Sequence, residues 1–581
     1  MKTNYTKLIG LAILGMASVA LSSCSNQKEK SDIPSNTDRN ISIRSVKYVN
    51  DDDVITINGQ QSDNTSDKLT ASSRNNANVS MDGMFSSVAP TFTIESASQF
   101  DFTTDMQSNA VERAGQSKAS SGKPRAADVP LGNKKKYRLV FVQEGNSTPI
   151  YNSVLSAGED PDLHVAANKK YSCYAFSVNN ADAVPNIDGS GNIASSDLEN
   201  KDFMFASGEI TTQDEENYLD ITFLRQMAAI DVTINTRGIF GGITDNSTFS
   251  VGSGSGSSFT NIIQTGKFNI FTATFSDFAD SEPVKGSQMT VVNSNWGNAE
   301  KVGRFFTANT SRTVAANNLR IRLNGLGITL DDNTTRNFAA NTIVPISHAA
   351  ALNLSKGTLS KTNVRLIESG ITVGGLVWAR TNMIYDTNKL YGGSYRAGNS
   401  DAYRFRTNNE YSRPNIDNEY WNFATSTPRG TDYQSVDQCR RVYPEGTWRL
   451  PKQDANPFEM KALSDNTNRT KSRKTVTDGN RFSLIWKGTQ AANSAYPDND
   501  LIISAYGYRS NANGGTIQQI PSGSTSGTGY LLTRSNAYTN SNTNYVLFAQ
   551  VDNGTISNTS VPTRAHNEGV PIRCVRNINN N

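Results

Sequence analysis

The side chains that most often carry covalent or metal chemistry are scarce in this 581-residue sequence. It holds four cysteines and three histidines, and the histidines lie far apart, at His164, His348 and His566. No pair of them has the spacing of a metal-binding motif such as H-x-x-x-H, and no G-x-S-x-G, H-E-x-x-H or P-loop motif occurs. We therefore expect no enzyme, no cofactor and no metal site.

Cys24 is the one cysteine whose position indicates a chemical role. Lys2 and Lys7 precede an apolar stretch over 8–21, which is shorter than the about 20 residues of a membrane-spanning helix and typical of an export signal. The stretch ends in Leu-Ser-Ser-Cys, which resembles the box of bacterial lipoproteins, whose cysteine is acylated and becomes the new N-terminus. An ordinary cleaved signal with a chance cysteine is the alternative. The resemblance implies export and lipidation of Cys24.

Charge balance and composition exclude one class of partner and favour one class of fold. The chain carries 56 Lys and Arg against 53 Asp and Glu, a net charge of +3, so no electrostatic argument favours nucleic acid as a partner. Charged residues make up only 19% of the chain, whereas Asn, Ser, Thr and Gly are abundant. Because these residues favour strands and turns over long helices, we expect a mainly β protein.

Alternation of apolar and polar residues predicts strands from about residue 91 onward. It is clearest in KYRLVFV, YSCYAFSV, AAIDVTIN and NLRIRLNGLGITL. We interpret the last as a hairpin that turns at Asn324-Gly325, a pair that suits a two-residue turn with positive φ. Cys173 falls on the small-residue face of its strand, so we expect a buried apolar residue and not a reactive thiol. Residues 24–90 are polar and predict a tether or propeptide region, interrupted by short strand-like pieces such as Ile41-Ser42-Ile43.

The order of these segments resembles the fimbrillin superfamily of Bacteroidales. The resemblance rests on the export signal, an F-D-F-T-T start, and then YRLVFV, KKYSCYAFSVNN and FLRQMAAIDVTIN, and it covers roughly residues 91–360. Members of that superfamily have two β-sandwich domains in tandem and assemble, as exported lipoproteins, into surface fimbriae. The resemblance implies a signal peptide over 1–23 and sandwiches over 91–236 and 237–362.

Residues 363–581 differ from the rest of the chain. They hold four of the five tryptophans, and WARTN, WRLPK, GYRS and PIRCVR occur in that order. This set resembles the lectin-like modules of Bacteroidetes surface proteins, which have the C-type-lectin-like fold. The resemblance implies an α+β module that acts as an adhesin, and Asn456, Pro457 and Glu459 suit the start of its helix. The paired sugar motifs of calcium-dependent lectins are not evident, so no calcium site is expected.

Two sets of residues are candidates for a role in this module. Cys439 and Cys574 could form a disulfide, which an exported protein can keep; formylglycine-generating enzymes, which share the fold, need reactive cysteines instead. Flat rings stack on sugars and dominate protein interfaces, so the candidate ligand-binding residues are Trp421, Tyr496, Tyr506 and Tyr508. Trp448 is expected in the core.

Together the resemblances imply an accessory or tip subunit of a surface fimbrium, similar to those of the major fimbrium of Porphyromonas. Its partners would be other fimbrial subunits and a glycan or a host or bacterial surface protein, with roles in adhesion, biofilm formation and virulence. In that family an Arg-specific protease cuts the N-terminal segment, and a strand from a neighbour fills the opened groove. Arg113 and Arg125 are candidate cut sites, although they could equally be plain exposed arginines.

The expected cellular location and the alternative functions follow from the same resemblances. The precursor would be lipid-anchored at the cell outer membrane, and the mature chain would lie in the fimbrium. The last residues, NINNN, are a poor donor strand, which favours a terminal position in the filament. An outer-membrane lipoprotein that captures glycans and never polymerises stays open as the alternative, and an enzyme ranks third.

Overall fold

The computed structural model describes most of the chain beyond residue 127 and three stretches before it. The described residues are 39–49, 95–96, 100–109, 128–132, 134–181, 183–213, 217–331, 333–406, 417–430, 437–452, 459, 469–476, 479–489, 495–496, 499–504, 507–510, 515–518, 527–532, 543–552, 555–560 and 563–577. Of the predicted site residues, Cys24, Arg113, Arg125 and Tyr506 lie outside this set.

Strands make up nearly all of the regular structure, so the prediction of a mainly β protein is confirmed. The helix α1 (Ser195–Leu198) has four residues. The other helical segments in the described part of the chain are short 3-10 turns: η2 (Gly286–Gln288), η3 (Gly297–Ala299), η4 (Thr387–Lys389), η5 (Asp417–Glu419) and η6 (Gln438–Arg441). The helix expected near Asn456 lies outside the described residues apart from Glu459. Within the described part, no helix is long and apolar enough to cross a membrane.

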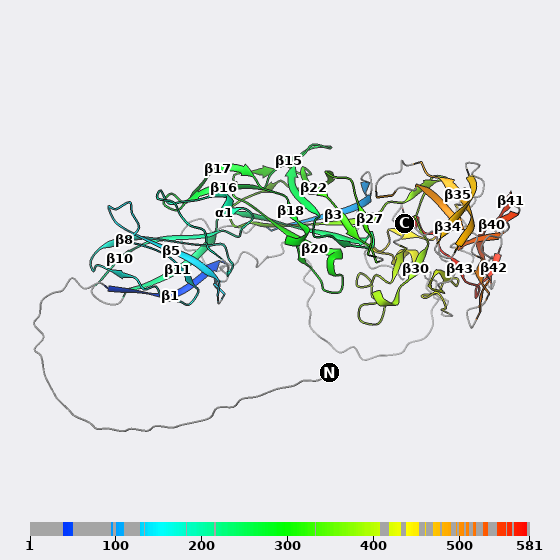
Figure 1. Ribbon diagram of the computed structural model, residues 1–581, viewed down its shortest axis with the longest axis horizontal. Coiled ribbons are helices and arrows are strands. Elements are labelled where there is room, and N and C mark those ends of the chain that lie inside the picture. Colours follow the sequence, from blue (N-terminus) through cyan, green and yellow to red (C-terminus); the bar gives the residue numbers. More distant parts are fainter. Residues whose placement is uncertain are drawn as a thin grey trace, which may run out of the picture.

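Three regions lie in a row along the long axis of the molecule (Figure 1). The first is built around an eight-stranded sheet. Its order is β4 (Asp128–Pro130), β1 (Arg39–Val49), β11 (Asn217–Arg225), β10 (Met204–Thr211), β8 (Lys170–Ser177), β5 (Lys136–Gln143) and β6 (Tyr151–Ser156), with β7 (His164–Val165) beside β1. Strands from both ends of this sheet contribute to one apolar cluster, so the sheet curves around its own core.

Both faces of β5, in the first sheet, are buried. Tyr137 and Phe141 belong to the core inside the curved sheet. Val140 and Val142 point to the other face and join a second cluster that also contains Phe268. That face is covered by α1 and by a small sheet in the order β17 (Thr274–Asp280), β16 (Gln264–Asn269) and β9 (Asn192–Ile193). The side chains of β5 therefore alternate as the sequence predicts, but neither of its faces is left to solvent, whereas β6, β10 and β11 each have exposed positions.

The second region is a sandwich of two sheets. The six-stranded sheet has the order β19 (Thr290–Val291), β20 (Glu300–Thr307), β12 (Ala228–Gly238), β27 (Leu359–Glu368), β3 (Phe100–Asn109) and β2 (Glu95–Ser96). The five-stranded sheet has the order β15 (Thr260–Asn261), β14 (Thr248–Ser253), β22 (Leu319–Gly325) and β25 (Thr342–Pro345), with β18 (Val284–Lys285) beside β14. Smaller sheets flank it: β13 (Gly242–Ile243), β23 (Gly327–Thr329) and β24 (Thr335–Asn337), and the pair β21 (Thr313–Val314) and β26 (Leu352–Asn353).

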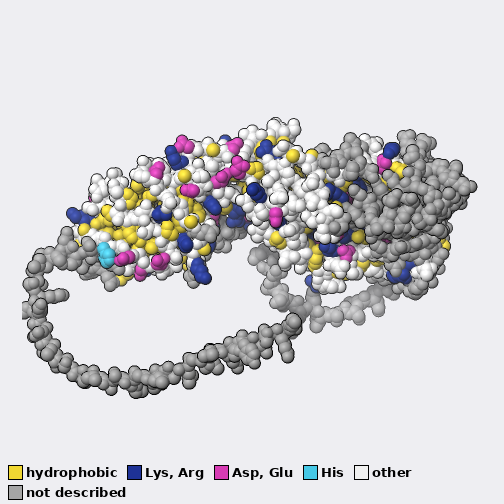
Figure 2. All heavy atoms as spheres, viewed as in Figure 1, with side chains coloured by type: hydrophobic (Ala, Val, Ile, Leu, Met, Phe, Trp, Pro, Cys, Tyr) yellow, Lys and Arg dark blue, Asp and Glu magenta, His cyan; other side chains and the backbone are white. Residues whose placement is uncertain are grey.

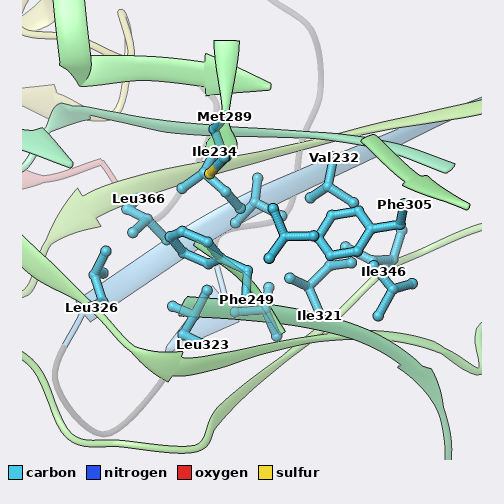
Figure 3. Close-up of a cluster of buried hydrophobic side chains, with 14 of the residues drawn as sticks. Val232, Ile234, Phe249, Met289, Phe305, Ile321, Leu323, Leu326, Ile346 and Leu366 are labelled. Atoms are coloured by element: carbon cyan, nitrogen blue, oxygen red, sulfur yellow. The ribbon is translucent and has the colours of Figure 1, made fainter. Parts of the chain in front are cut away.

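Apolar side chains from the two sheets of the sandwich meet in one core (Figure 3). Val232 and Ile234 on β12 face Phe249 on β14 and Ile321 on β22, and all four are buried. The alternating apolar positions of AAIDVTIN, which are Ile230, Val232 and Ile234, are thus core positions. Asp231, on the opposite face of β12, pairs with Arg304 of the neighbouring strand.

The sheets do not follow the predicted division at residues 236 and 237. β3 and β12 fall in the segment expected to form the first sandwich, yet both belong to the six-stranded sheet of the second region. β16 falls in the segment expected to form the second sandwich, yet Phe268 on it packs under the first sheet. Strands from each of the two predicted segments therefore contribute to both regions, because β3 and β12 pair with β27 and β16 packs against the first sheet. A boundary drawn in sequence order is therefore wrong here.

The predicted hairpin at Asn324-Gly325 is also wrong. β22 pairs with β14 and β25, whereas β23 pairs with β13 and β24, so the two strands belong to different sheets. Neither Asn324 nor Gly325 has the positive φ that a tight two-residue turn requires. Burial decides the path: Leu323 and Leu326 both enter the sandwich core, which carries the chain from one sheet to the next.

The third region, the C-terminal module, is assembled from short sheets. One has the order β28 (Ile371–Val373), β29 (Leu376–Trp378), β44 (Val575–Arg576) and β33 (Trp448–Arg449). The others are β30 (Met383–Tyr385) with β31 (Tyr403–Phe405); β32 (Tyr420–Trp421) with β43 (Val570–Pro571); β34 (Arg469–Val476), β35 (Gly479–Lys487) and β36 (Asp500–Ser504); β37 (Tyr508–Arg509) with β38 (Ile517–Gln518); and β39 (Gly527–Leu532), β40 (Thr543–Asp552) and β41 (Thr555–Ser560), with β42 (Thr563–Ala565) beside β40.

Candidate strand-exchange site

Three strands near the N-terminus, the long β1 and β3 and the two-residue β2, complete sheets whose other strands lie beyond residue 127. β1 lies in the first sheet between β4 and β11, and β3 lies in the six-stranded sheet between β27 and β2. Figure 1 shows β1 in the first region and β3 beside β27 in the second. One N-terminal stretch of chain therefore supplies a strand to each of the first two regions.

β1 is held by backbone pairing on both of its sides. It runs parallel to β11 from Ile41 opposite Asn217 to Tyr48 opposite Phe223, and antiparallel to β4. The amide of Ile41 also donates to the carbonyl of Leu163 at 3.1 Å. The segment predicted as a polar tether or propeptide region thus contains a full strand of the first sheet. A loosely ordered tether is therefore wrong for residues 39–49, whereas the propeptide stays a prediction.

Four apolar side chains of β1 turn into the core of the first region. Ile41 is fully buried, and Ile43, Val46 and Tyr48 pack against the same cluster. Their spacing changes from two residues to three between Ile43 and Val46, because the pairing with β11 contains an irregularity at Arg44. A bulge of this kind leaves one extra residue unpaired. The broken alternation explains why sequence reasoning saw only Ile41-Ser42-Ile43 as strand-like.

β3 pairs with β27 along its whole length. The antiparallel register runs from Phe100 opposite Glu368 to Asn109 opposite Leu359. On its other side β27 runs parallel to β12, so it lies between two long strands. Met106 of β3 packs against the sandwich core. Loss of β3 would leave the backbone groups of β27 unpaired along one edge.

The two candidate cleavage arginines lie in the stretch that joins these strands to the rest of the chain. β3 ends at Asn109 and β4 begins at Asp128, and both Arg113 and Arg125 fall between them. Their own surroundings are outside the described residues. One break after either arginine would separate β1, β2 and β3 from every later strand.

Two of the four candidate aromatic residues of the module are unavailable to a ligand. Trp421 is fully buried among aromatic rings that include Tyr385 and Tyr403, and its indole N–H donates to the carbonyl of Met383. Tyr496 is also buried, and its ring lies 3.9 Å from the guanidinium of Arg380. Both were expected as exposed rings, and that prediction is wrong because their polar atoms find partners inside the protein.

The other two aromatic candidates are Tyr506 and Tyr508, of which the structure describes only Tyr508. Tyr508 is partly exposed at the edge of the module core, and Tyr506 lies outside the described residues. Two partly exposed tyrosines that the sequence did not single out, Tyr385 and Tyr395, pack against the same core. The guanidinium of Arg441 lies 4.6 Å from the ring of Tyr395. No sequence pattern marks these rings, because their exposure depends on how the loops of the module fold.

The module is closed by a disulfide between the two predicted cysteines. Cys439 and Cys574 are both buried, with an S–S distance of 2.04 Å, and they are 135 residues apart in sequence. The bond joins η6 to the segment before β44. Cys173 is buried and unbonded, and burial raises the pKa of its thiol to about 11. The prediction of a buried Cys173 is confirmed.

Buried charges join the module to the sandwich. Arg237 at the end of β12 forms an ion pair with Asp401 of the module, with Nη2 and Oδ1 2.7 Å apart. Its guanidinium lies 4.0 Å from the ring of Trp296 and 3.9 Å from that of Tyr443. The pair is nearly excluded from water, since 2% of the Arg237 side chain and 12% of the Asp401 side chain are exposed. The two regions therefore share a desolvated contact at this pair.

A second buried carboxylate lies at the end of β27. Glu368 pairs with Arg336 at 3.5 Å, and Arg380 and Arg576 also act on its charge. Burial raises the pKa of Glu368 against the pull of these three arginines. The strand that pairs with β3 is thus anchored at one end among residues of both the sandwich and the module.

The described residues contain no group of three His, Cys, Asp or Glu side chains that could hold a metal ion. His164 is exposed near Asp162, and the ring of His348 accepts from the amide of Leu319 and contacts the carbonyl of Ala350. Lys, Arg, Asp and Glu side chains are interspersed over the face of the molecule that Figure 2 shows. Among the described residues drawn on that face, they do not gather into a large patch of one sign.

No family model and no curated protein sequence matches the chain. Solved structures of Bacteroidales proteins are similar in part. A protein of Bacteroides fragilis described as a proposed cell adhesion protein has 12% identity and a TM-score of 0.27, over 46% of this chain and 94% of that one. A fimbrial assembly protein of Parabacteroides distasonis has 10% identity and a TM-score of 0.20, over 39% of this chain and 82% of that one. At such scores the likeness carries no argument about function, and the proposal for this chain rests on its own residues.

Proposed function

We propose that this chain is an accessory or tip subunit of a bacterial surface fimbrium, incorporated by strand exchange and adhesive through its C-terminal module. The observation that carries this proposal is the position of β1 and β3. Both precede the stretch with Arg113 and Arg125, and both complete sheets formed by later residues. A single cut would make two strands replaceable.

The physical basis is the cost of an open sheet edge. Without β1, the backbone of β11 would lose its pairing along Asn217 to Phe223, and the core around Ile41 would meet water. Without β3, β27 would lose ten paired residues. Unpaired strand edges and uncovered apolar side chains favour the addition of an extended segment from another chain. A neighbouring fimbrial subunit is the proposed donor.

Cleavage after Arg125 suits this process best. The mature chain would then begin at Ala126, two residues before β4. β4 and β11 flank β1 in the sheet, so β4 would form one wall of the opened groove and β11 the other. An Arg-specific protease is the proposed agent. Cleavage after Arg113 would leave a longer tail on the same wall.

Cys24 would act as a delivery address. Its lipid would hold the precursor at the cell outer membrane until the cut. Cys24 lies on the N-terminal side of both candidate arginines, so the lipid would leave with the cut segment. The mature subunit would then be held in the fimbrium by strands of its neighbours.

The C-terminal module is the proposed adhesive part, of lectin-like type, with a glycan or a host or bacterial surface protein as ligand. Its fixed attachment through Arg237 and Asp401 would transmit force from a bound surface to the sandwich. Tyr508, with the partly exposed Tyr385 and Tyr395, is a more accessible aromatic candidate than Trp421 or Tyr496. Adhesion through this module would support biofilm formation.

The test is to isolate fimbriae and determine whether this chain is present and where it begins. We expect the chain to begin at Ala114 or at Ala126, directly after one of the two arginines. The double variant Arg113→Ala/Arg125→Ala should abolish both the new N-terminus and incorporation into fimbriae. Arg74→Ala is the matched control. A cut after Arg74 would release β1 but keep β3, so the loss of this arginine should leave the proposed N-terminus and incorporation unchanged. Fimbriae that contain the chain with Cys24 at its start would refute the cleavage step.

The alternative is an outer-membrane lipoprotein that binds glycans without polymerising. One observation favours it: with β1 and β3 in place, the intact chain already pairs both β11 and β27. Such a protein would stay lipidated at Cys24 and would not co-purify with fimbriae. The fimbrial isolation therefore decides between the two functions.

A further inference from the structure

A short sequence in the module repeats that of a proposed cut site. Residues 396–398 read Arg-Ala-Gly, as residues 113–115 do. An arginine is followed by alanine at two further places, the candidate site at Arg125 and Arg564 in β42. A protease that accepts the candidate sites would therefore meet the same residue types twice more. The surroundings of each bond decide whether it is cut, and Arg564 lies in a strand that pairs with β40.

The bond after Arg396 lies in the loop of a β-hairpin. β30 and β31 pair in antiparallel fashion, and residues 386–402 connect them. Residues 392–398 are exposed apart from the partly exposed Tyr395. The glycines of this stretch have positive φ and open space where a side chain would lie. Exposed loop tips of small residues are preferred sites of proteolysis, because a protease binds extended chain and such loops open at little cost.

Arg396 differs from other arginines whose side chains are exposed in the described part of the chain. Arg44 and Arg304 are exposed too, but each lies in a strand and forms an ion pair with a carboxylate. Within the described residues, no ion pair or hydrogen bond holds the guanidinium of Arg396. An Arg-specific protease binds the guanidinium through a carboxylate of its own, so Arg396 can enter such a site without breaking an existing pair.

Arg429 is also exposed in a loop, but its two neighbours are held in place. The carbonyl of Pro428 accepts a hydrogen bond at 2.6 Å from Nη2 of the buried Arg509. The carbonyl of Gly430 accepts one at 2.9 Å from Nδ2 of Asn422. Because these buried donors fix the backbone on both sides of Arg429, this loop resists the extended conformation that a protease binds. Arg429 therefore provides a matched control.

We propose that the bond between Arg396 and Ala397 is a further processing site, cut by the same Arg-specific protease. This inference rests on the proposed maturation and adds a cut inside the adhesive module. In the reaction, water adds across the peptide bond: its hydroxyl joins the carbonyl carbon of Arg396 and its hydrogen joins the nitrogen of Ala397. The proton of the new carboxylic acid then passes to the new amine, so the products are a carboxylate and an ammonium.

The module would stay together after this cut. Glu445 accepts hydrogen bonds from both sides of the bond, at 2.8 Å from the hydroxyl of Tyr395 and at 2.6 Å from the amide of Gly398. β30 and β31 lie on opposite sides of the cut and remain paired, and the disulfide of Cys439 and Cys574 lies wholly in the later piece. The mature subunit would therefore contain two polypeptides in the module, joined by packing and strand pairing.

The first test is limited digestion of the folded full chain with clostripain, an Arg-specific endoprotease, followed by N-terminal sequencing of the pieces. We expect a piece that begins at Ala397, together with one that begins at Ala114 or Ala126. Arg396→Lys should remove the Ala397 piece alone, because lysine keeps the charge of the loop but is a poor substrate. Arg429→Lys is the matched control and should leave the pattern unchanged.

Glu445 should limit the rate of the new cut, because its two hydrogen bonds hold the loop closed. Glu445→Ala removes both bonds, so the loop should open more often and the bond after Arg396 should be cut about tenfold faster. The cuts after Arg113 or Arg125 should keep their rates, since those arginines lie outside the module. An equal rate with and without Glu445 would overturn its role in holding the loop.

The second test applies the same sequencing to the chain from isolated fimbriae and from the outer-membrane fraction. A piece that begins at Ala397 is the expected result. A chain that begins at Ala126 with an intact bond after Arg396 would overturn this inference and leave the proposed maturation standing. A cut after Arg396 in a chain that still begins at Cys24 would refute the proposed maturation and keep the site in the module.

Discussion

The first two regions and the C-terminal module complete their sheets in opposite ways. In the first two regions, β1 and β3 come from a stretch that a single cut would detach, and only non-covalent contacts hold them. In the module, β44 near the C-terminus completes the sheet beside β29 and β33, and a disulfide from Cys574 to Cys439 ties that segment in place. In the first two regions the strand that completes the sheet could be exchanged, whereas in the module the corresponding strand is fixed by a covalent bond.

The difference shows where change can occur in this molecule. A strand held by pairing and burial can be replaced by another strand with the same pattern. A strand tied by a covalent bond cannot leave while the bond is intact. The contact of Arg237 with Asp401 lies between these two parts and joins them. The predictions that follow break each of these connections in turn.

The largest effect should come from removal of the N-terminal strands. Cleavage between Arg113 and Arg125, followed by separation of the fragment in mild denaturant, should destabilise the first region by on the order of 5 kcal/mol, since Ile41 and three partly buried apolar side chains leave the core. Thermal unfolding measures it, with the cleaved but unseparated protein as control. An unchanged unfolding temperature would mean that these strands are not structural.

Loss of the disulfide should rank next. Cys439→Ala/Cys574→Ala opens a loop closed by two residues that lie 135 positions apart, which should cost up to about 5 kcal/mol in the chain-entropy model. Denaturant unfolding followed by the fluorescence of the four module tryptophans reports it. Because the bond is confined to the module, exchange of β1 for another strand should be unaffected. A matching loss of exchange would show that the two parts are not independent.

Loss of the ion pair between the module and the sandwich should lower the free energy of unfolding by somewhat less. Asp401→Ala leaves the buried guanidinium of Arg237 without its carboxylate, and we expect a loss of about 3 kcal/mol. The control is Asp277→Asn, which breaks the exposed pair with Lys267 and should change stability by under about 1 kcal/mol. Equal effects of the two variants would show that the Arg237 contact does not join the regions.

The smallest effect concerns Cys173, the unbonded cysteine of the first region. Its folded pKa of about 11 exceeds the ordinary value of 9.0, so its burial stabilises the fold while the thiol is protonated. That contribution should fall as the pH rises from about 9 to 11. At pH 8 the native thiol should react with iodoacetamide roughly a hundredfold more slowly than in denaturant. Rapid native alkylation would place Cys173 outside the core.

Sequence patterns predicted the local structure well where one rule governed it. The alternation in β5, β8 and β12 identified inward side chains such as Phe141, Phe176 and Val232, because a strand places successive residues on opposite faces. The patterns failed where another part of the molecule set the conformation. A carboxylate on β11 holds the bulge at Arg44, and burial of Leu326 replaces the expected turn at Asn324-Gly325.

The candidate site shows the same limit. The sequence supplied Arg113 and Arg125 as possible cut sites and Cys439 and Cys574 as a possible disulfide. It could not show that strands before the arginines complete two different sheets. Nor could it separate the buried Trp421 from the partly exposed Tyr395, because aromatic residues serve equally in cores and in binding surfaces.

The amino-acid sequence by itself determined that this protein is mainly β, and which side of each regular strand is apolar, because those properties depend on composition and on the two-residue period of a strand. The tertiary structure alone decided which strands share a sheet. Pairing between β3 and β27, or between β1 and β11, joins residues more than 150 positions apart. Such pairing is settled by the fit of backbone edges and side chains in space, and no local pattern encodes it.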